Sequence, residues 1–142
     1  MSDSALTDDV RAALTSGHLA HLTTLNTDGS PQVSVVWVGL DGGDVVSGHL
    51  GMRQKLRNVQ RDGRVVLSLE TGVRNPMGLD EYLVVHATGR VTEGGGPELL
   101  QRLAHVYLGP DVKFPPFDDP PPGYVLRMTP TRVTGVGPWS SE

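Results

Sequence analysis

The chain has 142 residues, and this length predicts one domain over residues 1–142. Eighteen glycines and 11 prolines favour short strands and many turns over a helical bundle. A net charge of −4 and an aromatic content of 5% argue against nucleic acid as a partner. Because the chain has no cysteine, disulfides, thiolate metal sites and a cysteine nucleophile are excluded.

The sequence shows no sign of a membrane or export segment. No apolar run reaches the roughly 20 residues that a membrane-spanning helix needs. The first residues, Met1 to Ser4, lack the basic and apolar regions of a signal peptide. We therefore expect a cytoplasmic protein that makes no contact with membranes.

Helical patterns occur at three places in the chain. Thr7 can cap a first helix, which Gly17 ends. Apolar residues at helical spacing predict a second helix over residues 51–62. Pro97 suits the first turn of a third helix, which Gly109 ends.

Segments with an apolar period of about two residues predict antiparallel strands. The expected strands span 18–25, 32–40, 45–49, 64–70, 81–93, 124–128 and 132–136. Stretches rich in glycine and proline predict loops at 71–79 and 111–122 and a break at 129–131. This order of elements predicts a mainly β (α+β) fold, a small antiparallel barrel with short flanking helices.

Basic side chains gather on the second expected helix. Five of the 12 basic residues of the chain lie between positions 53 and 64, on this helix and just after it, and Asp62 is the only acid among them. They are Arg53, Lys55, Arg57, Arg61 and Arg64. The backbone of residues 47–51, just before them, carries little steric cover. A helix start with adjacent cations is a natural phosphate site, although a solvated helix face would show the same residues.

Other kinds of chemistry have less support in the sequence. His18 and His21 would lie on opposite faces of a strand, so they cannot share a metal ion, and we expect no metal site. The chain has no nucleophile elbow, Walker loop or dinucleotide fingerprint. We therefore assign no catalytic residue and expect a bound cofactor to carry any reactive chemistry.

Four segments in order resemble the pyridoxamine-phosphate-oxidase-like split β-barrel proteins. They are the opening strands at 20–38, a phosphate-binding helix at 53–62, a long central strand at 81–91 and a closing strand at 127–133. Within that superfamily, the pattern looks most like the flavin/deazaflavin oxidoreductases of the B group. Those proteins typically use coenzyme F420, an 8-hydroxy-5-deazaflavin with a phosphate and a polyglutamate tail.

The resemblance implies a homodimer with cofactor sites between the subunits, and hydride transfer to a conjugated small-molecule acceptor. The residues it assigns to cofactor binding are Gln32, Val33, Ser34, Gly48, His49, Arg53, Lys55, Arg57, Asn58 and Tyr82. Arg53 and Lys55 would hold the phosphate beside the backbone at 48–49. Residues 32–34 would line the ring edge, and Tyr82 would act near the site across the dimer. Arg57 and Asn58 would support the helix or meet the tail.

Three other readings of the sequence stay open. An FMN-dependent oxidase or reductase of the same fold would use the same cations, because FMN also carries a phosphate. A non-catalytic cofactor- or haem-binding barrel would take its axial ligand from the histidines His18, His21, His49 and His86. A dimeric barrel without any ligand is the third. The segment from Phe114 to Pro122 is either a lid or a packed surface loop, and we favour the loop.

Overall fold

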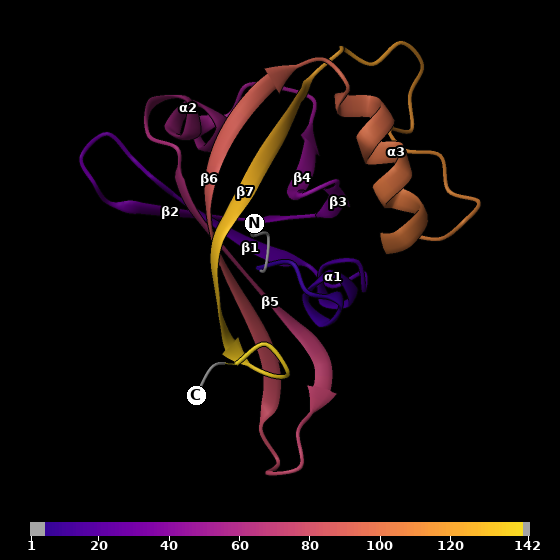
Figure 1. Ribbon diagram of the computed structural model, residues 1–142. Helices are drawn as coiled ribbons and strands as arrows, with labels where there is room; N and C mark the ends of the chain where they lie inside the picture. Colours follow the sequence, from indigo (N-terminus) through magenta and orange to yellow (C-terminus); the bar gives the residue numbers. More distant parts are fainter. Residues whose placement is uncertain (1–4, 141–142) are drawn as a thin grey trace.

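The computed structural model describes residues 5–140, which form one seven-stranded antiparallel sheet and three helices (Figure 1). The strands are β1 (Ala20–Leu25), β2 (Pro31–Val36), β3 (Gly39–Asp41), β4 (Asp44–His49), β5 (Arg64–Arg74), β6 (Asp80–Glu93) and β7 (Tyr124–Val136). The helices are α1 (Asp8–Leu14), α2 (Gln54–Arg61) and α3 (Gly96–Tyr107). The strand order is β2-β1-β5-β6-β7-β4-β3, with β6 at the centre. The prediction of a mainly β fold with short flanking helices is confirmed.

The expected helix starts are confirmed at both ends of the chain. The hydroxyl of Thr7 accepts a hydrogen bond from the backbone N–H of Val10 at 3.4 Å, which caps α1. Pro97 lies in the first turn of α3, where its missing N–H leaves no helical bond unmade.

The single strand expected over residues 32–40 is wrong. The chain divides into β2 and β3, which lie at opposite edges of the sheet. The indole of Trp37 stacks on the ring of Tyr107 with centroids 5.4 Å apart, and the Tyr107 hydroxyl accepts from the backbone N–H of Val38 at 3.1 Å. Contacts with α3 therefore replace strand pairing at this point.

Two expected interruptions of strands are also wrong. The loop expected at 71–79 is shorter, because β5 continues to Arg74 through a register shift that contains Gly72, at φ +80°. The break expected at 129–131 is absent, and β7 runs continuously beside β6. Pro130 lies at a bulge in that pairing, where a strand tolerates a residue that has no N–H donor.

Two groups of buried side chains hold these elements together. The larger fills the barrel and includes Leu22, Leu56, Leu67, Leu83 and Leu126. The smaller packs α3 against β4 and β7 and consists of Val46, Leu99, Leu103 and Val125. Both faces of β4 are therefore buried, and alternate residues of this strand face the barrel interior and α3.

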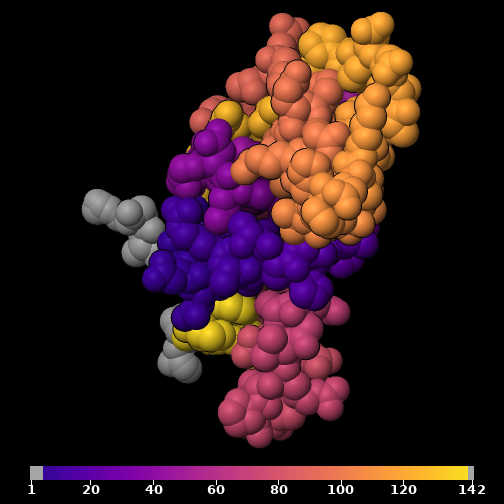
Figure 2. Space-filling model, turned by 90° about the vertical axis from the view of Figure 1, so that its right-hand side faces the viewer, coloured from indigo at the N-terminus to yellow at the C-terminus, as the bar shows by residue number. Residues whose placement is uncertain are grey.

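The proline-rich segment at 111–122 is a packed loop, as the sequence favoured. The side-chain nitrogen of Gln101 on α3 donates to the carbonyl of Val112 at 2.8 Å, and its oxygen accepts from the N–H of Phe114 at 3.0 Å. The ring of Phe114 also contacts Trp37. Figure 2 shows this loop and α3 as one continuous orange surface above the indigo N-terminal segment.

Among residues 5–140, no helix is both long enough and apolar enough to cross a membrane.

Candidate functional site

The basic cluster lies at the start of α2, which is shorter than expected. The helix begins at Gln54 rather than at residue 51, and Arg53 is its extended N-cap residue without a side-chain capping bond. Leu56 and Val59 are buried, as the helical spacing predicts. The close packing of Val59 over Gly89 of β6 fixes the position of the helix: a Cβ atom on Gly89 would lie 3.1 Å from the valine side chain.

The five basic residues of the cluster have two different environments. Arg61 donates to the side-chain oxygen of Asn58 and to the carbonyl of Leu25, and Arg64 forms a salt bridge with Asp62 at 2.7 Å. The other three make no salt bridge and no side-chain hydrogen bond within residues 5–140: they are Arg53, Lys55 and Arg57. The cations without a protein partner are therefore those at and near the helix start.

Lys55 is half-buried among like charges. Burial, and then the positive charge of Arg53, lowers the pKa of the Lys55 ammonium below its ordinary value. No acidic residue occupies the first turn of α2 to offset these charges. An anion at this position would relieve the repulsion and also meet the positive end of the helix dipole.

His49 lies beside these cations but inside the barrel. Its Nε2 atom is 2.8 Å from the hydroxyl of Ser47, and both side chains are buried. Burial, and then the charge of Lys55, lowers the pKa of His49 from 6.5 to about 4. His49 is therefore neutral at ordinary pH. Ser47, which the sequence analysis did not assign, lies two residues away on the same face of β4.

The strand end before α2 is more covered than the sequence predicts. Gly48 faces α3, and a Cβ atom there would lie 3.0 Å from the carbonyl oxygen of Gly96 and 3.1 Å from the side chain of Leu100. The glycine is thus required by the approach of the helix. The expectation of an uncovered backbone at 47–51 does not hold at Gly48.

Asn58 joins α2 to the first hairpin. The side chain is completely buried, and its Nδ2 atom lies 3.0–3.1 Å from three side-chain oxygens. These belong to Thr24, Asn26 and Gln32. Its Oδ1 atom accepts from Gln54 at 2.8 Å and from Arg61 at 3.3 Å. The sequence analysis placed Asn58 at this helix but could not show that it contacts the hairpin.

The structure separates the three residues expected along the ring edge. Gln32 and Ser34 share the face of β2 that meets α2, and both are half-buried. Val33 points to the opposite face, where 59% of it is exposed. Gln32 is the one of the three that contacts α2 through a side-chain hydrogen bond.

Tyr82 does not join the cluster within one chain. It lies near the start of β6, paired with Glu70 and Val136. Gly89, which packs under α2, is seven residues further along the strand, or about 23 Å at about 3.3 Å per residue. Figure 1 shows α2 near the upper end of β6, whereas the strand begins at the lower end.

The histidines do not form a metal site. No group of three or more potential metal ligands occurs among the described residues. His18 precedes β1 and lies 2.8 Å from the Ser16 hydroxyl, and His86 lies 3.2 Å from the Arg132 guanidinium. The argument that His18 and His21 share a strand is therefore wrong, because β1 begins only at Ala20.

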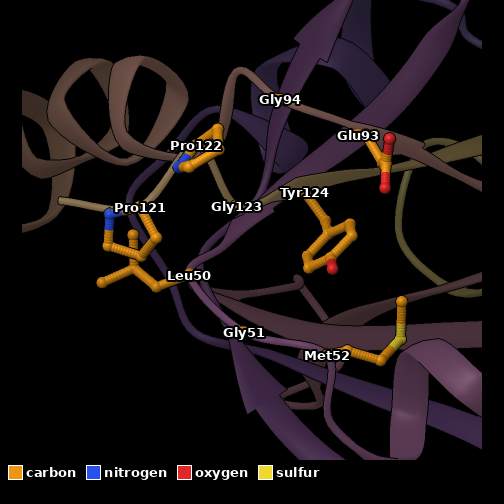
Figure 3. Close-up of a pocket in the computed structure, with 9 residues that line it drawn as sticks. All are labelled: Leu50, Gly51, Met52, Glu93, Gly94, Pro121, Pro122, Gly123 and Tyr124. Carbon is orange, nitrogen blue, oxygen red and sulfur yellow. The ribbon is translucent and has the colours of Figure 1, made fainter.

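A pocket of about 420 Å³ adjoins the start of α2. Its lining comes from three separate parts of the chain: Leu50, Gly51, Met52, Glu93, Gly94, Pro121, Pro122, Gly123 and Tyr124. Figure 3 shows the ring of Tyr124 between Glu93 and Met52 on one side of the pocket, and Leu50 and Pro121 on the opposite side. The sequence analysis missed this pocket, because no local spacing brings residues 93–94 and 121–124 beside 50–52.

These features define an antiparallel split-barrel protein in which cations at the start of a short helix have no partner among the described residues. The model of the pyridoxamine 5'-phosphate oxidase family matches residues 6–137, so the chain belongs to that family. No curated protein matches the chain in sequence.

Several solved structures are similar to the chain. An F420 reductase is 26% identical, with a TM-score of 0.71, over 87% of this chain and 94% of that one. A conserved hypothetical protein from Mycobacterium tuberculosis is 19% identical, with a TM-score of 0.69, over 99% and 88% of the two chains. A heme binding protein from Mycobacterium smegmatis is 24% identical, with a TM-score of 0.65, over 96% and 55%. The last two similarities concern the fold alone.

Proposed function

We propose that this chain is an F420-dependent reductase that transfers a hydride to a conjugated small-molecule acceptor. The observation that carries the proposal is a set of three basic side chains that have no partner among residues 5–140: Arg53, Lys55 and Arg57. The similarity to an F420 reductase supports the choice of cofactor.

The charge distribution suits the phosphate of such a cofactor. Burial and the charge of Arg53 lower the pKa of Lys55, and a dianionic phosphate would relieve this repulsion and stabilise the ammonium group. Arg53 is exposed at the helix N-cap and can approach the same anion from solvent. Arg57 lies one turn beyond Arg53 and would bind the acidic tail of the cofactor.

We expect the remaining parts of the ligand to lie next to this anchor. Gln32 and Ser34 face the helix from β2 and would meet the ring edge. The pocket at Leu50 and Met52 offers apolar walls for a conjugated acceptor. When bound, the reduced deazaflavin supplies the hydride, and a proton completes reduction of the acceptor. The protein's part is to orient the two molecules.

A second copy of this chain would complete the site. Val33 and Val35 are 59% and 53% exposed on the outer face of the edge strand β2. Strand pairing puts Val33 on the same face as His86 and, four residues earlier on β6, Tyr82. Burial of this apolar face in a homodimer would remove it from water. It would also bring a partner's tyrosine toward a site from which it is remote within one chain.

Two other ligands, FMN and haem, make different demands on the residues of this fold. FMN would satisfy the same cations, so it is titrated beside F420. A haem at this site would need a histidine with an open nitrogen close to the basic cluster. His49 is buried against Ser47, and His18 and His86 lie beside Ser16 and Arg132. His21 is exposed, but it lies on the outer face of β1, opposite the face that meets α2. No observation in the site favours haem over a phosphate-bearing ring.

The test is a fluorescence titration of the purified protein with F420 and, separately, with FMN. We expect saturable binding of F420 that is tighter than binding of FMN, followed by oxidation of reduced F420 when a quinone or nitroaromatic is added. A yellow protein that releases FMN on denaturation and ignores F420 would instead establish the flavin-dependent alternative. Absence of binding to either cofactor, with no rise in melting temperature, would refute both.

A further inference from the structure

The orientation of the buried Asn58 amide is determined by its arginine neighbour. A guanidinium group has only donors, so the Asn58 atom that faces Arg61 at 3.3 Å must be its oxygen. Gln54 donates to the same oxygen at 2.8 Å. The amide nitrogen of Asn58 therefore points the other way, toward the hairpin of β1 and β2.

That orientation is passed on to Gln32. The Nδ2 atom of Asn58 lies 3.1 Å from the Gln32 side chain, and a donor at this distance needs an oxygen opposite it. If the Gln32 amide were turned over, two nitrogen donors would face each other. Gln32 is thus held with its oxygen toward Asn58 and its –NH₂ group directed away from it.

The –NH₂ group of Gln32 has no hydrogen-bond partner among residues 5–140. Gln32 is half-buried, so the group is accessible without being fully solvated. Asn58 follows Lys55 by three residues on α2, a rise of about 4.5 Å. One rigid helix thus carries the proposed phosphate anchor and the residue that orients these donors.

We propose that Asn58 is a positioning residue that presents the Gln32 amide as a pair of donors for the carbonyl-bearing edge of a bound heterocycle. The identification of that heterocycle as the deazaflavin ring rests on the proposed function. Because the Gln32 –NH₂ group can only donate, it favours an acceptor atom of the ring, a carbonyl oxygen or a ring nitrogen, over an N–H group at the point of contact. Arg61 thus fixes the orientation of the Asn58 amide, and Asn58 fixes that of the Gln32 amide.

The first test exchanges these donors for acceptors. Gln32→Glu keeps the shape of the side chain and replaces the –NH₂ group with a carboxylate oxygen. We expect its affinity for F420 to fall tenfold or more, whereas its affinity for inorganic phosphate, measured by competition, stays within twofold of wild type. Gln60→Glu is the matched control, because it adds the same charge at an exposed position of α2 and should bind F420 as wild type does.

The second test begins with the wild-type sequence, so its first measurement cannot fail through misfolding. In ¹⁵N-labelled protein, the side-chain amide pair of Gln32 should shift when F420 is added and stay in place when inorganic phosphate is added. In Asn58→Asp, whose carboxylate attracts a donor, Gln32 should turn over and lose the F420-induced shift even where the variant still folds.

The outcomes separate this inference from the proposed function. Unchanged F420 affinity in Gln32→Glu, or an amide pair that ignores F420, overturns the donor role and leaves the F420 assignment intact. Failure of the wild-type protein to bind F420 overturns both.

Discussion

The hydroxyl of Ser47 lies 2.8 Å from Nε2 of His49, and both side chains are buried on the barrel side of β4. The imidazole of His49 is neutral and lies near the half-buried ammonium group of Lys55. Protonation of His49 would add a second positive charge where burial already disfavours one. Protonation of His49 should therefore lower the stability of the fold in acid.

The first prediction concerns acid stability. The pKa of His49 is about 4 in the folded chain and 6.5 ordinarily, so the unfolded chain binds more protons between these values. The contribution of His49 to the free energy of unfolding is complete above pH 6.5 and is lost as pH falls toward 4. At about 1.4 kcal/mol per pKa unit, the full loss is about 3–4 kcal/mol. Urea titrations at several pH values measure it.

His49→Gln is the comparison for that experiment, because glutamine can still bond to Ser47 but does not titrate. The carboxylates are common to both proteins, so their effect cancels when the two free energies of unfolding are subtracted. The remaining difference should change between pH 6.5 and 4. Parallel stability curves over this range would show that His49 is not the responsible group.

The second prediction concerns the phosphate anchor. Lys55→Ala and Arg53→Ala should each weaken F420 binding by about 1.5–3 kcal/mol, the cost of losing a charged hydrogen bond. Fluorescence titration at fixed ionic strength measures the change. Lys113→Ala removes the only other lysine, which forms an exposed pair with Asp118, and should bind normally. If both site variants bind like wild type, the anchor lies elsewhere.

The third prediction concerns assembly. Val35→Glu places a charge in the centre of the apolar outer face of β2 and should convert the proposed homodimer to a monomer. Light scattering after size-exclusion chromatography gives the mass directly. Val106→Glu introduces the same change at an equally exposed valine on α3 and should leave the assembly intact. A monomeric wild-type protein would remove the shared-site proposal.

The fourth prediction concerns the strand break. The Tyr107 hydroxyl accepts from Val38 at 3.1 Å and donates to the carbonyl of His18 at 2.9 Å. Tyr107→Phe leaves both backbone groups without this partner and should lower the free energy of unfolding by about 1–3 kcal/mol. Tyr124→Phe, whose hydroxyl makes no hydrogen bond within residues 5–140, should change stability little. Equal effects of the two substitutions would argue against the hydroxyl bridge.

Local signals in the sequence determined the three helices, most of the strands and the position of the basic cluster. The helix signals are local. Thr7 caps and Pro97 begins a helix within one turn of its own position, and the spacing of Leu56 and Val59 defines the buried face of α2. These effects can therefore be predicted before the tertiary structure is known. The strand pattern around Trp37 misled for the opposite reason. Its apolar alternation continues to Leu40, but a stacking contact with α3 interrupts the pairing.

Only the tertiary structure decided which cations are free and how the polar groups around them point. Arg61 is occupied because the carbonyl of Leu25 lies beside it, and Gln32 is oriented because Asn58 lies between β2 and α2. Sequence periodicity reports which side of its own element a residue occupies. It does not report which group from a distant segment will meet it, and hydrogen-bond direction depends on that partner.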